Sequence, residues 1–143
     1  MWNYIWPLLL VVGANTCYNI CAKGTPEQLH PFASLTLTYV TAAAVSLLLF
    51  LVTSPSRDFL SEIRHMNWTT FGFGVVIVGL ELGYIQLYRA GWNVSVGPLV
   101  ANILLAVVLL ALGVLFYKEA LHWNQLLGML LCAGGLVLIN VNL

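Results

Sequence analysis

One carboxylate, Glu81, lies inside a stretch that is otherwise apolar, GLELGYIQLYRAG at residues 79–91. In the middle of a bilayer, a charged side chain costs about 2.5–3.5 kcal/mol on insertion scales. Desolvation disfavours the charged form of an acid, so such a carboxyl group is a candidate for binding and releasing protons. The alternative is a neutral, hydrogen-bonded glutamate in a helix interface. Because acids buried in membranes are functional by default, we expect Glu81 to bind protons or substrate.

Four further polar side chains are spaced so that they could share a site with Glu81. Residues three or four apart lie on one face of a helix, which places Tyr84 and Tyr88 on the Glu81 face. Aromatic rings attract cations, so this face suits an organic cation, and simple packing is an equal explanation for the rings. Asn15 and Asn19 form a polar face that should point into the bundle, for binding or for interhelical hydrogen bonds.

A sixth candidate, Asn102, lies one turn inside an apolar segment that opens with Gly97-Pro98. A Gly-Pro pair at a helix start can unwind the backbone and free polar groups to line a cavity. Alternatively, Pro98 simply occupies the first helical turn, where its missing N–H has no partner to lose. The predicted substrate-binding and proton-binding residues are Glu81, Tyr84, Tyr88, Asn15, Asn19 and Asn102.

The sequence contains no motif typical of an enzyme or of a bound metal or cofactor. It lacks nucleophile–base pairs, phosphate-binding loops and metal-ligand spacings. The histidines fall in or beside predicted loops, and the cysteines lie in apolar runs, where they are expected as small packing residues. These residues are His30, His65, His122, Cys17, Cys21 and Cys132. We expect no enzymatic activity, no metal and no cofactor.

Composition places this chain in a membrane. Of its 143 residues, 61% are hydrophobic and 7% are charged, whereas a soluble domain carries about a quarter charged residues. So few charges cannot cover a core of this size, so lipid must solvate most of the surface. The formal net charge is zero, and without a basic patch nucleic acid is excluded as a partner. The predicted fold class is an all-α integral membrane protein.

Five apolar segments are long enough to cross a bilayer as helices, which takes about 20 residues. The polar connector 54–68 is the longest loop and has room for a short interfacial helix. The other loops are too short to fold alone, so residues 1–143 are predicted to form one transmembrane domain. The five predicted helices run at about residues 3–22, 32–53, 69–88, 95–116 and 123–141.

The basic residues give only a weak preference for one orientation in the membrane. Five crossings would place Arg57, Arg64 and Lys118 on the side of the N-terminus, and Lys23 and Arg89 on the other. Positive residues favour the cytoplasmic side, so this difference mildly favours a cytoplasmic N-terminus. The opposite orientation remains compatible with the sequence.

The C-terminal half carries a pattern of family-specific residues. A long apolar helix ends in Lys118-Glu119, then come Leu121 and Gln125–Gly128, and the run AGGLVLIN at 133–140 completes it. This pattern resembles the closing half of an EamA repeat, the repeat of the drug/metabolite transporter superfamily. The segment LGYIQLYRAGWNVSVG also fits the third helix of that repeat and its following loop. The first two helices match by length and placement only.

The resemblance implies a secondary transporter. Most such proteins have ten helices in two inverted five-helix repeats, and the small multidrug transporters are four-helix relatives that work as antiparallel dimers. This chain resembles one five-helix repeat standing alone. The small relatives use a glutamate in their first helix, where this chain has Asn15 and Asn19, so the resemblance assigns no role to Glu81. Its cavity-lining helices, the first, third and fourth of each repeat, would include all six candidate residues.

We therefore expect a ten-helix dimer that exports a small organic metabolite or drug-like solute, such as a cation, by proton-coupled alternating access. Five crossings leave the chain ends on opposite sides, so an antiparallel homodimer or an inverted paralogue would complete the architecture; a parallel homodimer is the third option. Two other functions stay open: a flippase subunit for lipid-linked carriers, and a non-transporting assembly or regulatory subunit. The expected location is a cell membrane, specifically the bacterial inner membrane, with lipids and protons as partners.

Overall fold

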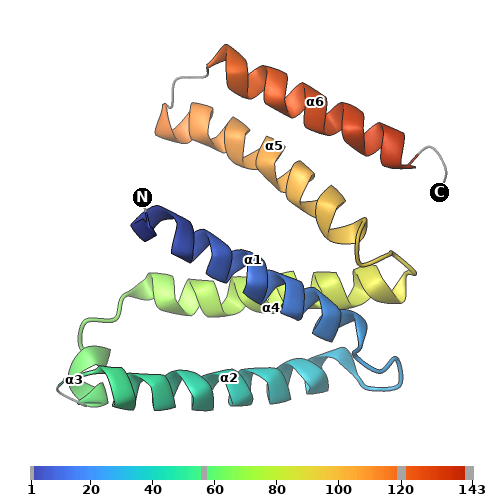
Figure 1. The fold of residues 1–143 in the computed structure, drawn as a ribbon. Coiled ribbons are helices and arrows are strands. Elements are labelled where there is room, and N and C mark those ends of the chain that lie inside the picture. Colours follow the sequence, from blue (N-terminus) through green and yellow to red (C-terminus); the bar gives the residue numbers. More distant parts are fainter. Residues whose placement is uncertain (1, 56–57, 119–121, 141–143) are drawn as a thin grey trace. The chain divides into compact units, whose positions relative to one another are not determined.

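The computed structural model describes residues 2–55, 58–118 and 122–140. These residues form six helices and no strand (Figure 1). Five long helices lie at the five apolar segments of the sequence, and one short helix lies in the polar connector. The helices are α1 (Trp2–Lys23), α2 (Pro31–Thr53), α3 (Phe59–Ile63), α4 (Trp68–Arg89), α5 (Gly97–Tyr117) and α6 (Trp123–Asn140).

Four of the helices, α1, α2, α4 and α5, are long and apolar enough to cross a membrane. This confirms the prediction of an all-α membrane protein. The helix α6 lies at the fifth predicted segment, but it is not among these four candidates within the described residues. The predicted end of that segment, residue 141, lies outside the described residues. The fifth membrane crossing therefore stays a prediction.

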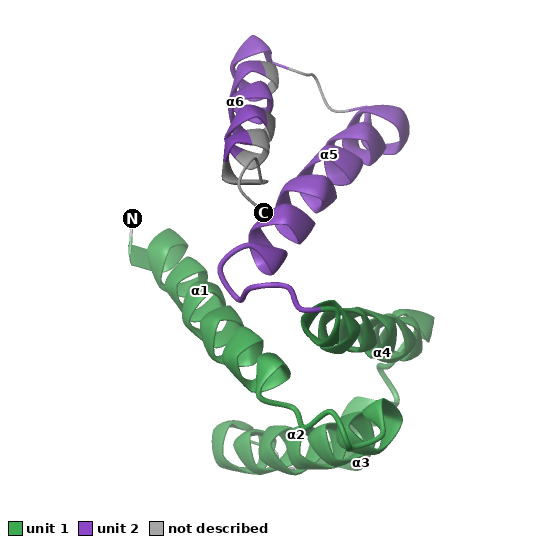
Figure 2. Ribbon diagram, turned by 90° about the vertical axis from the view of Figure 1, so that its right-hand side faces the viewer, with its two compact units in different colours: residues 1–90 green, residues 91–143 purple. Residues whose placement is uncertain are grey.

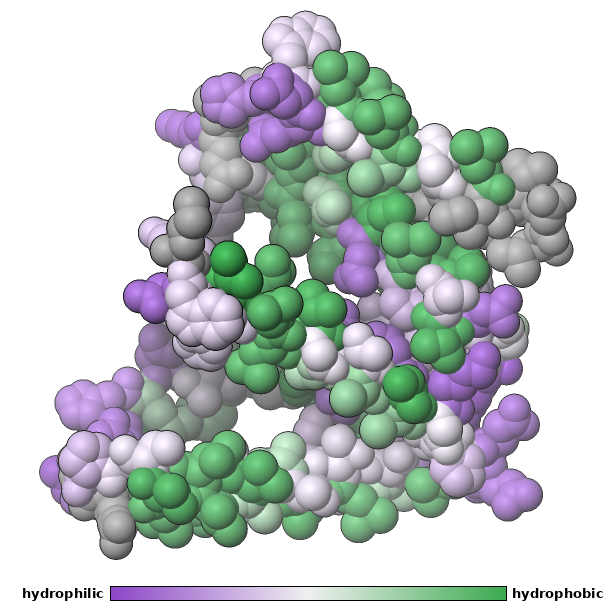
Figure 3. All heavy atoms as spheres, viewed as in Figure 1, coloured by the Kyte–Doolittle hydropathy of each residue, from purple (hydrophilic) through white to green (hydrophobic). Residues whose placement is uncertain are grey.

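Most of the apolar surface of the helices is not covered by the chain itself. Among the described residues, only three hydrophobic residues expose less than a tenth of their surface: Leu35, Ile85 and Tyr88. Along α2, at the bottom of Figure 3, hydrophobic side chains lie exposed on the surface. Exposed apolar surface on this scale requires lipid or another protein to cover it.

The chain divides into two compact units, residues 1–90 and residues 91–143 (Figure 2). The first unit contains α1 to α4, and in it α4 packs against both α1 and α2. The second contains α5 and α6, which pack against each other. The prediction of a single domain over residues 1–143 stays a prediction.

Local sequence signals explain where two of these helices begin. The Asn67 side chain caps α4 by accepting a hydrogen bond from the Thr69 N–H at 3.0 Å, which satisfies one of the free donors at the helix start. Pro98 lies in the first turn of α5, which is a continuous helix from Gly97. Of the two interpretations of Gly97-Pro98, the structure therefore supports the first-turn proline.

A buried hydrogen-bond network joins α1 to α4. The Tyr88 hydroxyl donates to Asn19 Oδ1 at 2.6 Å. Asn19 Nδ2 in turn donates to Asn15 Oδ1 at 2.9 Å and to the Asn15 carbonyl oxygen at 2.8 Å. Only 5% of the Asn19 surface is exposed. Both polar atoms of its amide are thus satisfied by protein groups, as burial in a membrane demands.

Arg89 joins the end of α4 to the loop between α1 and α2. Its Nη2 atom donates to the carbonyl oxygens of Leu29 at 2.7 Å and of Pro26 at 3.1 Å. The last turn of α4 therefore lies at the same end of the first unit as the α1–α2 loop. This agrees with α1, α2 and α4 running alternately up and down.

Replacing Tyr88 by Phe should destabilise the first unit. The substitution keeps the ring but leaves Asn19 Oδ1 buried without a donor, which costs about 1–3 kcal/mol. The double variant Tyr88→Phe/Asn19→Leu should recover part of this loss, because it removes both partners rather than one. Thermal unfolding of the purified protein in detergent measures the effect, with the exposed Tyr117→Phe as a matched control. A single variant as stable as Tyr117→Phe would contradict the network's structural role.

Replacing Arg89 by Leu should loosen the α1–α2 loop. Two hydrogen bonds from a charged donor are lost, and a destabilisation of about 2 kcal/mol is expected, which corresponds to a fall of roughly 5 °C in the unfolding midpoint. Arg64→Leu, in the exposed C-cap of α3, serves as the matched control and should leave the midpoint unchanged. Equal midpoints for the two variants would argue against this role for Arg89.

Candidate functional site

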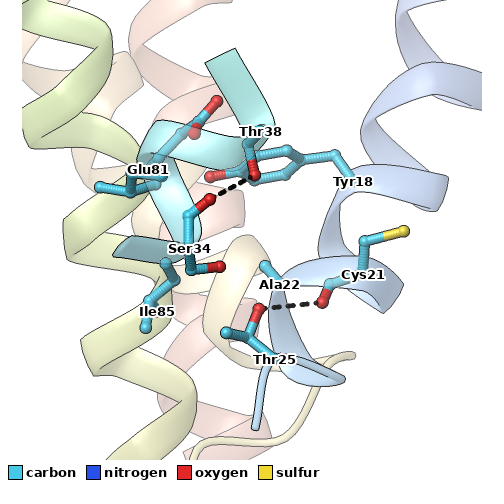
Figure 4. A pocket seen from close by; sticks show the side chains of 9 residues that line it. Tyr18, Cys21, Ala22, Thr25, Ser34, Thr38, Glu81 and Ile85 are labelled. Carbon is cyan, nitrogen blue, oxygen red and sulfur yellow. Dashed lines mark hydrogen bonds between the residues drawn. The ribbon is translucent and has the colours of Figure 1, made fainter. Parts of the chain in front are cut away.

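The first unit contains a cavity of about 190 Å³ between α1, α2 and α4. Each of the three helices contributes side chains to its wall, and the sequence position of these residues places the cavity in the half of the unit nearer the α1–α2 loop. Figure 4 shows the side chains around it. The lining residues are Tyr18, Cys21, Ala22, Thr25, Ser34, Leu35, Thr38, Glu81 and Ile85.

Glu81 is the charged residue of this wall, and it is partly buried. Its carboxylate interacts electrostatically with the hydroxyls of Tyr18 on α1 and Tyr39 on α2. Figure 4 shows the Tyr18 ring extending from α1 toward Glu81. Both oxygen atoms are buried. The Tyr39 hydroxyl lies within hydrogen-bonding reach of Glu81, and Tyr18 Oη has no hydrogen-bond partner among the described residues. Three helices thus bring one acid and two phenols together.

Two threonine hydroxyls in the wall are already committed as donors. Thr38 Oγ1 donates to the Ser34 carbonyl oxygen at 3.1 Å, and Thr25 Oγ1 donates to the Cys21 carbonyl oxygen at 3.3 Å (Figure 4). A hydroxyl whose proton bonds its own helix still offers its lone pairs as acceptors. The cavity wall therefore presents acceptor atoms: these two oxygens and the Glu81 carboxylate.

A row of three tyrosine rings links α1 to α4 beside the cavity. Tyr18 and Tyr84 meet edge to face, with ring centroids 5.5 Å apart and an angle of 86° between the planes. The Tyr84 and Tyr88 centroids are 6.3 Å apart. Such arrangements contribute about 0.5–1.5 kcal/mol beyond the burial of area. The row fixes the Tyr18 ring, and with it the direction of the Tyr18 hydroxyl.

The structure places the six candidate residues of the sequence in three different settings. Glu81 lines the cavity, and Tyr84 lies beside it in the row of rings. Asn15, Asn19 and Tyr88 form the hydrogen-bond network between α1 and α4 and do not line the cavity. A binding role for each of them stays a prediction.

Asn102, the sixth candidate, belongs to the second unit and lines a different cavity. This cavity has a volume of about 430 Å³ and lies between α5 and α6. Its wall is mostly apolar, with Asn102 and Gln125 as its amide side chains; the Gln125 amide oxygen also accepts a hydrogen bond from the His122 N–H at 3.1 Å. A shared site of Asn102 and Glu81 stays a prediction.

Sequence patterns alone did not indicate Tyr18, Tyr39 or the α2 hydroxyl residues that line the Glu81 cavity. Spacing could not single them out, because hydroxyl residues occur on every face of the α2 segment, FASLTLTYVT. The one pattern in the sequence that could have pointed to this face is the four-residue spacing of Ser34 and Thr38, which both line the cavity. Only the packing of α2 against α4 shows which of these faces Glu81.

No group of three or more His, Cys, Asp or Glu side chains that could hold a metal ion occurs among the described residues. The three cysteines are free thiols on exposed positions of their helices. The wall around Glu81 offers a carboxylate and neutral hydroxyls, which can bind a proton or a donor-bearing ligand.

Comparison with known proteins agrees with this interpretation. The profile of the EamA-like transporter family matches residues 2–141, almost the whole chain. No match was found among curated proteins or among solved structures. The chain therefore belongs to the EamA-like transporter family, multi-pass membrane transporters of the drug/metabolite type.

Proposed function

We propose that this protein exports a small cationic solute in exchange for protons, and that Glu81 binds the two alternately. The observation that carries the proposal is the position of Glu81 in the wall of a cavity built by three helices. No Lys, Arg or His is among the residues that line this cavity. The charge of an ionised Glu81 is therefore left for a proton or a ligand to neutralise.

Proton and solute compete because hydrocarbon does not tolerate an uncompensated charge. A carboxylate in this setting is neutralised when it takes up a proton, and equally when a cation binds next to it. Once either the proton or the cation is bound, the charge is neutralised and the other binds weakly. Coupled exchange at a single site requires such competition, and one acid is enough to produce it.

The wall chemistry favours a solute with N–H donors and a positive charge. Thr25 and Thr38 offer lone pairs, and Glu81 offers a carboxylate, so an ammonium or guanidinium group would find several acceptors. The rings of Tyr18 and Tyr84 lie beside these acceptors and can attract a cation with their faces. An anionic solute would meet the Glu81 carboxylate without a compensating cation.

The size of the cavity supports a second copy as part of the working carrier. Ligand pockets usually have volumes of about 300–1,000 Å³, whereas this cavity has about 190 Å³. A second copy could extend the cavity to the usual size. On α4, Gly79 and Gly83 are exposed, and a methyl group added at either would meet no atom within 4 Å. Such a face admits close approach of another helix.

The two copies are proposed to lie antiparallel in the membrane. A unit with an odd number of crossings can form an inverted pair only by inserting in both orientations or by pairing with an inverted paralogue. Inverted repeats place a binding site near the middle of the membrane and allow two equivalent states, open to opposite sides. The nearly even distribution of basic residues is compatible with both orientations.

The mostly apolar cavity of the second unit favours one alternative, transport of a lipid-linked carrier. At about 430 Å³, with an amide at Asn102 and apolar side chains such as Ile103 and Val107, it would suit a hydrocarbon chain. Under this alternative, the protein would move a polyprenyl-linked lipid between leaflets and would fail to move soluble cations. Assays with reconstituted vesicles distinguish the two substrates directly.

Glu81→Gln should abolish the pH dependence of transport, because the amide cannot exchange a proton. The assay measures uptake of a small aromatic or alkyl ammonium probe into proteoliposomes with an imposed pH gradient. Uptake should fall by at least about tenfold, the effect of losing 1.4 kcal/mol of charge pairing. Glu62→Gln, in the exposed helix α3, is the matched control and should transport as the unchanged protein does.

The proposed role of Glu81 fails if the Glu81→Gln variant folds, inserts and still transports the probe with the full pH dependence. Binding of the probe to purified protein provides a second readout. It should raise the unfolding midpoint of the unchanged protein more at high pH than at low pH, because protons then compete less.

An antiparallel pair predicts labelling from both membrane faces. A cysteine in place of Ser61, in the exposed helix α3, should react with a membrane-impermeant maleimide in about equal amounts from either side of the membrane. Labelling from one side only would exclude an antiparallel homodimer and favour a paralogue partner or a parallel pair. The Cys17, Cys21 and Cys132 thiols lie within long helices, and the unsubstituted protein measures their background labelling.

A further inference from the structure

We propose that Tyr18 and Tyr39 act as the two hydrogen-bond donors that hold Glu81 ionised between the release of its proton and the arrival of the solute. This inference rests on the proposed exchange at Glu81 and adds the groups that make it reversible. In a membrane, an ionised carboxylate that has neither a proton nor a solute bound carries a high free-energy cost. Hydrogen-bond donors supplied by the protein lower that cost.

The first observation is that both phenol oxygens are buried and have no protein partner other than the acid. Among the described residues, Tyr18 Oη has no hydrogen-bond partner, and the Tyr39 hydroxyl lies within hydrogen-bonding reach of Glu81 alone. Leaving a buried hydroxyl unpaired costs about 1–3 kcal/mol, and buried polar groups in native proteins rarely lack a partner. The Glu81 carboxylate is the acceptor that can satisfy both hydroxyls.

The second observation is that the two hydroxyls share one electrostatic partner. Tyr18 comes from α1 and Tyr39 from α2, and both interact with the Glu81 carboxylate on α4. The two donors therefore reach the acid from two different helices. A carboxylate can accept several hydrogen bonds at once, and those from phenols are of the strong, charge-assisted kind.

The two threonine hydroxyls of the wall, and the Tyr88 hydroxyl beside it, are engaged elsewhere. The Thr25 and Thr38 hydroxyls donate to carbonyl oxygens of their own helices. On α4, the Tyr88 hydroxyl donates to Asn19, and the Tyr84 ring packs against Tyr18. Cys21 on α1 also lines the cavity, and a thiol is only a weak donor.

The two phenols would also set the balance between proton and solute. Donors to the ionised carboxylate make it a weaker base, so protons leave it more readily, and they lower its attraction for a cation as well. Removing a donor should therefore favour protonation, and at high pH it should tighten cation binding. A residue with a purely structural role would not produce these two opposite effects.

The test follows the protonation of Glu81 directly by infrared spectroscopy. The carboxylic C=O band that is lost in Glu81→Gln reports this residue in the full-length protein in lipid vesicles. In Tyr18→Phe and in Tyr39→Phe, the midpoint of this band's titration should move to higher pH by about one unit each, which is the effect of one charge-assisted hydrogen bond. The double variant should move it further.

Matched controls isolate the role of the phenols. Tyr117→Phe on α5 and Tyr4→Phe on α1 make the same chemical change at exposed positions outside the cavity. Neither should move the midpoint. Unchanged midpoints in both Tyr18→Phe and Tyr39→Phe would overturn the inference, and so would a shift in Tyr4→Phe as large as theirs.

A second measurement needs no substitution at all. Replacing the six tyrosines biosynthetically by 3-fluorotyrosine gives more acidic phenols, which are stronger donors, so the Glu81 midpoint should move to lower pH. An unmoved midpoint would contradict the inference. Failure of the proposed function would look different: Glu81→Gln would keep its pH-dependent transport, while the infrared titration would still report whether the phenols act on Glu81.

Discussion

The absence of any solvent for charge inside a bilayer governs this structure. Every polar group within the helices must find a partner made of protein, and the chain meets this demand mostly within single helices. On α2 alone, the hydroxyls of Thr36, Thr38, Thr41 and Thr53 each donate to the carbonyl oxygen four residues earlier. Between helices, the Asn19 amide and the Tyr88 hydroxyl satisfy each other. Against this background, Glu81 and the two phenols beside it, Tyr18 and Tyr39, are the exception.

In the part of the chain that the structure describes, the first unit is organised around the small cavity at Glu81 and has no large core. The helices bury few side chains against one another, and among the described residues only Leu35, Ile85, Tyr88 and Asn19 are nearly inaccessible side chains. Close packing is concentrated where α1 and α2 meet the second half of α4. The same contacts that stabilise this unit therefore also bring the Tyr18 and Tyr39 hydroxyls near Glu81.

The sequence predicted the helices well, because apolar length is a strong signal and lipid leaves few alternatives to a helix. It also made Glu81 a candidate, since an acid in hydrocarbon is conspicuous without any structure. It did not single out Tyr39. It placed Asn15 and Asn19 among the candidate binding residues, and the structure shows them in a network with Tyr88; a binding role for these residues stays a prediction. Helical periodicity tells which residues share a face, but it does not tell which face of the next helix lies opposite. That information depends on side-chain packing across two chain segments.

The bond between Arg89 and the α1–α2 loop has a consequence for how such a carrier would move. Thr25, which borders the Glu81 cavity, lies directly before Pro26, and Arg89 holds the carbonyl oxygens of Pro26 and Leu29. A conformation that opens this end to water would have to break or shift those two contacts. Their strength then contributes to the free-energy difference between the inward-open and outward-open forms. A guanidinium outside the cavity would thus help to set how long the carrier dwells in each form.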